Sequence, residues 1–191
     1  MSASPLFSSR PSKDALDERL QQLMKAVGAL PESKFHDASD DVIVAELVAT
    51  SPLAVPRIVG DGNKQSSSTR ASEEQDQVLF TFEVRYEGQS QFFGWIPSVT
   101  SGGARPQAVV MADHLRLAFS VVNGRDPDQL VEAAQFRFRL ELAEIERYLE
   151  WLRNDIRENE ATVRNILSAL VRDRRTFFLR SGEINQGLAN D

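Results

Sequence analysis

The feature that most constrains this chain is an uninterrupted helical stretch, "FRFRLELAEIERYLEWLRNDIRENEATVRNIL", at residues 136–167, which contains neither Gly nor Pro. Its apolar residues recur at alternating spacings of four and three. That 3.5-residue repeat is typical of a coiled-coil seam, where one helix buries a narrow apolar line against another. The predicted seam consists of Phe138, Leu142, Ile145, Leu149, Leu152, Ile156, Asn159, Val163, Ile166 and Leu170.

The length of the helix favours pairing with another chain. We predict a helix over 125–180, because Asp126 can cap it, Pro127 suits its first position, and no breaker follows before Ser181. A helix of roughly 50 residues spans about 75 Å, whereas a compact domain of this size has a radius of gyration of about 16 Å. We therefore expect a projecting helix that forms a homo-oligomer, with a dimer favoured. The alternatives are one helix of a compact bundle and a helix that folds back within 154–161.

Asn159 is the polar member of the predicted seam. A polar side chain there costs stability but can fix register and oligomer number, because only the correct alignment satisfies its amide. The alternative is that Asn159 faces water where the seam opens.

The segments before this helix predict a small α+β domain within 12–124. Ser12 can cap an amphipathic helix that ends near Gly28, and residues 39–47 favour a second, short helix over a strand. Alternating apolar residues in "VLFTFEVRY" indicate a strand with one buried face. With "QFFGWI", "QAVVM" and "HLRLAFSV" it predicts an antiparallel meander of about four strands. Its expected core includes Phe80, Phe82, Leu117 and Phe119.

Three polar segments are expected to lie outside the core. Residues 1–11 contain two prolines and predict a flexible arm. Residues 61–77 are Ser-rich and without periodicity, which predicts a mobile loop, and 181–191 form a tail.

Composition restricts the classes of function. The chain has no Cys, which excludes disulfides and thiolate metal sites, and its net charge of -6 argues against a surface built for nucleic acid or anionic lipid. No apolar run is long enough for a secretory signal or a membrane span. We therefore expect a cytoplasmic protein with no membrane partner.

Residues that carry chemistry are sparse. His36 lies among Asp37, Asp40 and Asp41, but this spacing matches no established metal motif, and His114 is alone on the polar face of a strand. The sequence contains neither a phosphate-binding loop nor a nucleophile elbow. We expect no catalytic residue, no cofactor and no metal, and hence a non-enzymatic protein.

A basic region lies near the end of the long helix, formed by Arg164, Arg172, Arg174, Arg175 and Arg180, with Phe177 and Phe178 between them. Arginines and aromatic rings can bind phosphate and stack on bases. Cations also stabilise a helix C-terminus by opposing its dipole, which needs no ligand. The favoured interpretation is therefore a stabilised helix end, and a contact with phosphate or with a protein partner is the alternative.

A set of residues recurs along the predicted strand pair, hairpin and long helix: Phe93, Pro97, Ser98, Leu142, Ile145, Glu146, Tyr148, Leu149, Trp151, Asp155, Asn159, Arg174 and Arg175. In these residues the chain resembles an uncharacterised bacterial module, whereas Gly94, Trp95 and Ile96 depart from the module's "RYRPS" form. The resemblance covers about residues 78–176. It implies an association with effector domains of bacterial defence systems. The expected function is an assembly, adaptor or regulatory protein with a protein partner or effector subunit. The alternative is a nucleic-acid-binding accessory protein that uses the basic region.

Overall fold

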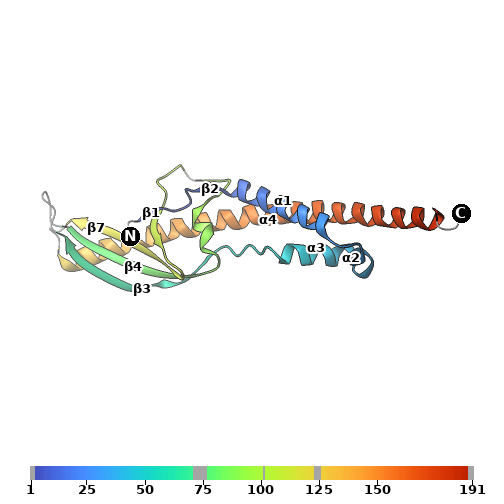
Figure 1. Cartoon of the computed structure of the whole chain (residues 1–191). Coiled ribbons are helices and arrows are strands. Elements are labelled where there is room, and N and C mark those ends of the chain that lie inside the picture. Colours follow the sequence, from blue (N-terminus) through green and yellow to red (C-terminus); the bar gives the residue numbers. More distant parts are fainter. Residues whose placement is uncertain (1–2, 71–76, 101, 123–125, 189–191) are drawn as a thin grey trace. The chain divides into compact units, whose positions relative to one another are not determined.

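The computed structural model describes residues 3–70, 77–100, 102–122 and 126–188, with side chains described outside 61–70 and 182–188. The chain divides into two compact units. Unit 1 contains Met1–Ser12 and Ala54–Asn154, and unit 2 contains Lys13–Leu53 and Asp155–Asp191. The elements, most of which are labelled in Figure 1, are β1 Ser4–Pro5, β2 Arg10–Pro11, α1 Ser12–Ala29, α2 Glu32–Asp37, α3 Asp40–Ala49, β3 Arg57–Arg70, β4 Gln77–Glu87, the 3₁₀ helix η1 Ser90–Gly94, β5 Trp95–Ile96, β6 Gln107–Val110, β7 His114–Val122 and α4 Pro127–Leu188.

The α+β class and the long C-terminal helix are both confirmed. Helix α4 is continuous from Pro127 to Leu188, so it does not fold back within 154–161 and it continues into the segment expected to be a tail. The domain boundaries differ from the prediction. We expected one α+β domain followed by a separate helix, but α4 contributes to unit 1 up to Asn154 and to unit 2 beyond it.

The main sheet of unit 1 has the order β1-β6-β7-β4-β3, with antiparallel neighbours throughout. Its apolar face packs on the first part of α4, where the Phe82 ring stacks on Phe138 with centroids 4.5 Å apart. Phe80, Phe82 and Leu117 are buried, as predicted, while Phe119 is only partly buried. The alternation of "VLFTFEVRY" therefore identified the correct inner face of β4.

Two of the predicted segments have different structures. Of the expected mobile loop at 61–77, residues 61–70 belong to strand β3, which pairs with β4 over registers such as Ser66↔Thr81, and Gln77 begins β4, while 71–76 lie outside the described residues. Backbone hydrogen bonds to a neighbouring strand do not require an apolar side-chain pattern, so the polar sequence concealed this strand. The segment "QFFGWI" is not a returning strand. It forms η1 and the short β5, which pairs in parallel with β2.

The expected flexible arm at 1–11 is wrong for the part that the structure describes. Ser4 pairs with Ala108 in the sheet, and Leu6 and Phe7 are buried. Phe7 adopts a left-handed backbone conformation, with φ of 52°, which an aromatic residue rarely does without compensation. The compensation is contact, because the Phe7 ring stacks on Tyr148 with centroids 4.7 Å apart.

Unit 2 is built from helices. Ser39 caps α3 by accepting a hydrogen bond from the Val42 N–H at 3.4 Å, which explains why residues 40–49 form a helix despite a β-branched run. This confirms the prediction that residues 39–47 favour a short helix over a strand. Helices α1, α2 and α3 pack with the second part of α4 around a core of Leu23, Val27, Phe35, Ile43, Val44, Leu47, Val48, Val163, Leu167 and Val171.

Candidate interaction surface

The predicted seam is largely buried by the chain itself. Phe138, Ile145, Leu149, Leu152, Ile156 and Val163 are at most 8% exposed, and Leu142, Asn159, Ile166 and Leu170 are partly buried. Phe138 packs on the sheet of unit 1, and Val163 belongs to the core of unit 2. Our premise that the chain cannot cover so long a helix is therefore wrong, because each unit covers its own part of α4. A partner chain has little access to this line of residues.

Of the two interpretations of Asn159, exposure of its amide to water does not fit the structure, whereas a role in fixing register stays a prediction. It is partly buried, and its Oδ1 is enclosed with no hydrogen-bond partner among the described residues. The oxygen therefore does not face water. An amide oxygen left in this state destabilises the fold, because it has lost its water without gaining a donor.

The opposite face of α4 in unit 1 carries apolar side chains that no other described residue covers. Phe136 is 56% exposed and Leu140 is 57% exposed. They belong to a line of exposed residues at helical spacing that we call the outer stripe, formed by Glu132, Phe136, Leu140, Ala143 and Arg147. Large apolar side chains grouped on an exposed helix face commonly mark an interaction site.

The outer stripe has a signal in the sequence that the heptad analysis missed. The segment "FRFRLEL" alternates apolar and charged residues, which is a strand pattern placed on a helix. At about 100° per residue, side chains two positions apart lie on nearly opposite faces of a helix. Phe136 and Leu140 must therefore lie opposite Phe138 and Leu142. The sheet that covers Phe138 cannot also cover Phe136 and Leu140.

Arg175, one of the predicted phosphate-contact residues, is an internal anchor of unit 2. Its guanidinium donates to Asp40 Oδ1 at 2.8 Å and to the Ala38 carbonyl at 2.7 Å, and also to the Phe35 carbonyl. One side chain thereby joins the end of α2 to the beginning of α3. These contacts occupy donors that a phosphate would need.

The other arginines of the basic region do not gather around one point. The Arg174 guanidinium lies 5.1 Å from the centre of the Phe178 ring, while Arg164, Arg172 and Arg180 are exposed. Arg164 and Arg180 are separated by about 24 Å along the helix axis. This spread fits a solvated helix surface better than a single phosphate site.

Arg19 of α1 is a buried cation that no sequence pattern identified. It is 5% exposed, and its Nε donates to the Ser51 carbonyl at 3.0 Å. Its two terminal nitrogens have no hydrogen-bond partner among the described residues. Burial lowers the pKa of Arg19, and the neighbouring Glu160 carboxylate opposes that shift.

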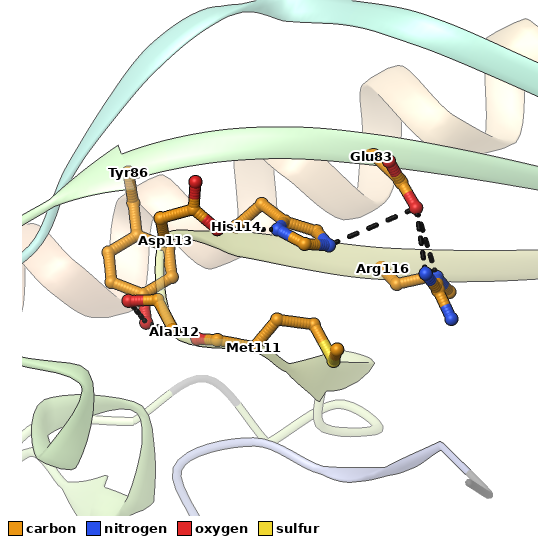
Figure 2. A network of polar contacts seen from close by, with 7 residues as sticks. All are labelled: Glu83, Tyr86, Met111, Ala112, Asp113, His114 and Arg116. Atoms are coloured by element: carbon orange, nitrogen blue, oxygen red, sulfur yellow. Dashed lines mark hydrogen bonds and ion pairs between the residues drawn. The ribbon is translucent and has the colours of Figure 1, made fainter.

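His114 belongs to a polar network on the sheet of unit 1 (Figure 2). Its Nδ1 lies 2.8 Å from Asp113 Oδ1, and its Nε2 lies 3.8 Å from Glu83 Oε1. Arg116 donates to the same Glu83 oxygen at 2.9 Å and 3.2 Å. Both ring nitrogens therefore lie near carboxylates, and Nε2 is buried with no hydrogen-bond partner among the described residues. The hydrogen bond from His114 lowers the pKa of Asp113.

Tyr86 closes the neighbouring turn (Figure 2). Its hydroxyl donates to the Met111 carbonyl at 2.6 Å and lies 3.2 Å from the Ala112 carbonyl. Burial raises the pKa of Tyr86. These contacts give the tyrosine a structural role between β6 and β7. Within the described residues, His, Asp and Glu side chains do not form a cluster suited to a metal ion.

Comparisons with protein-family models, with curated proteins and with solved structures gave no match. The resemblance to a bacterial module, and the defence context that it implies, therefore stay predictions. In the described part of the chain, every helix is too short or too polar to cross a lipid bilayer.

Proposed function

We propose that this protein is an assembly or adaptor protein that carries out no reaction of its own and self-associates through helix α4. The observation that carries the proposal is the exposure of Phe136 and Leu140 on a helix whose other face is already buried. Each side chain leaves apolar area in water that a second helix could cover, which favours association. A protein partner such as an effector subunit would then bind a multivalent assembly rather than a single chain.

Sedimentation velocity over a range of concentrations tests this proposal. We expect the wild-type protein to form a dimer at micromolar concentrations. The double substitution Phe136→Gln and Leu140→Gln should abolish the dimer with little loss of fold stability, because both side chains are exposed. Leu179→Gln is the matched control, since Leu179 is also an exposed apolar residue of α4, at 51%. A protein that stays monomeric throughout, or a double variant that associates normally, refutes the proposal.

The alternative function is nucleic-acid binding by the basic region. It has less support, because Arg175 and Arg174 are engaged within the chain and leave the exposed arginines far apart. Fluorescence anisotropy with labelled RNA and duplex DNA separates the two functions. Binding that weakens steeply with salt and is lost in Arg172→Gln or Arg180→Gln would favour the alternative. The adaptor proposal expects no such binding.

A further inference from the structure

The outer stripe has an internal symmetry that bears on how two copies pair. Its members follow spacings of four, four, three and four along α4, so they share one face of the helix. About the point between residues 139 and 140, Glu132 is the mirror position of Arg147, and Phe136 is the mirror position of Ala143. Each acidic or large residue therefore has a basic or small residue at the equivalent distance on the other side.

From this symmetry we propose that the dimer partner is a second copy of this chain, paired antiparallel through the outer stripe with its twofold axis between residues 139 and 140. The inference rests on the proposed function, which requires self-association through α4. A twofold interface is self-complementary, so a contact of residue i with residue j occurs twice. Here Glu132 faces Arg147 of the second copy, Phe136 packs against its Ala143, and the two Leu140 side chains meet beside the axis.

Charge and size both favour this orientation over a parallel one. A parallel pair in register places each residue opposite its own copy, so that Glu132 meets Glu132 and Arg147 meets Arg147. Like charges facing each other oppose association, whereas the antiparallel pair has two attractive contacts at its ends. It also sets a large side chain against a small one, which lets two helices approach without a clash or a void.

The residues that form this surface are available for pairing. Glu132 and Ala143 are exposed, and the Arg147 side chain is 53% exposed. Arg147 is held along the helix by Glu144 and by the Trp151 ring, whose centre lies 5.7 Å from the guanidinium. These contacts restrain the arginine on the stripe, which reduces the entropy that it would lose on binding.

A charge-reversal cycle tests the pairing. Glu132→Arg alone and Arg147→Glu alone each create two repulsive contacts, and each should weaken dimerisation about tenfold. The double variant restores opposite charges at both ends and should return the dissociation constant to within about threefold of wild type. Glu158→Arg is the control, because Glu158 is an exposed residue of α4 outside the stripe. It should leave dimerisation unchanged.

Spin labels measure the orientation directly, since the chain has no native Cys. With Gln129→Cys labelled, antiparallel pairing separates the two labels by about 31 Å along the axis, because residue 129 faces residue 150 of the second copy. Parallel pairing places them about 10 Å apart. A mixture of Gln129→Cys and Glu150→Cys proteins should give the short distance only for antiparallel pairing.

The outcomes separate the inference from the proposed function. A dimer with antiparallel label distances and a rescued double variant supports both. A dimer with parallel distances, or one that is indifferent to the charge reversals, overturns the pairing but leaves self-association intact. A monomer at every concentration overturns the proposed function and the pairing with it.

Discussion

The anchoring role of Arg175 gives a quantitative prediction for the substitution Arg175→Met. Methionine keeps most of the unbranched stem but removes the guanidinium and its hydrogen bonds to Asp40 and to the carbonyls of Phe35 and Ala38. A hydrogen bond involving a charged group contributes about 1.5–3 kcal/mol, and the carbonyls left behind lose a partner. The arginine side chain is 27% exposed, and water can replace part of what is lost. We therefore expect the free energy of unfolding to fall by about 2–4 kcal/mol.

Equilibrium urea unfolding, followed by far-ultraviolet circular dichroism, measures this loss. Arg175→Lys should give an intermediate value, because an ammonium group keeps the charge but cannot reach three acceptors with the planar geometry of a guanidinium. Arg172→Met is the matched control. Arg172 is exposed on the same helix, so its loss should change stability by less than about 0.5 kcal/mol.

A loss below about 1 kcal/mol for Arg175→Met, comparable to that of the control, would refute the anchoring argument. The Arg175 guanidinium would then contribute little to the free energy of unfolding despite its contacts. In that case its contribution to a phosphate site would have to be reconsidered.

Three further predictions concern the cores of the two units. Phe82→Ala should destabilise by about 3–5 kcal/mol, because it removes a buried ring stacked on Phe138, and a urea-derived loss below about 1 kcal/mol would contradict this packing. Tyr86→Phe should cost about 1 kcal/mol near neutral pH. The folded pKa of Tyr86 is raised above 10.0, so the stabilisation by its hydroxyl is present below the unfolded pKa and is lost as pH rises through the folded pKa. The difference in unfolding free energy between wild type and Tyr86→Phe should therefore shrink when urea titrations are repeated at alkaline pH. Asn159→Leu should raise the midpoint of thermal unfolding, because it removes the enclosed amide oxygen. Asn165→Leu is the control at an exposed site of α4 and should give no gain. Equal midpoints for the two variants would contradict this explanation.

Local sequence signals predicted the elements whose structure is decided locally. The Ser39 cap outweighed the β-branched run after it, and alternation in residues 78–86 identified the inner face of β4. Periodicity could not identify the partner of the long helix. A heptad repeat predicts that one face of the helix is buried but does not identify what covers it. The same repeat is compatible with a second chain, a sheet or a helical bundle.

The parts that the sequence did not reveal depend on contacts between distant residues. Arg175 binds atoms that lie about 135–140 positions earlier, so only the folded chain distinguishes it from Arg172. Strand β3 obtains its structure from β4 rather than from its own Ser-rich sequence. Phe7 was overlooked because two apolar residues between prolines form no pattern, although the folded chain stacks this ring on Tyr148.

The division of α4 between the two units has a consequence for how the protein is made. Neither unit is a continuous piece of sequence, and each needs part of the last long helix to complete its core. During synthesis from the N-terminus, Phe82 cannot meet Phe138, and Leu167 cannot join the core that contains Leu23, until the corresponding part of α4 has left the ribosome. The apolar faces of the sheet and of α1 and α3 therefore stay open for much of translation. Premature termination near the start of α4 would leave both apolar surfaces uncovered, and termination just after Asn154 would still leave the apolar faces of α1 and α3 uncovered. Either product is a substrate for chaperones and proteases rather than a smaller working protein.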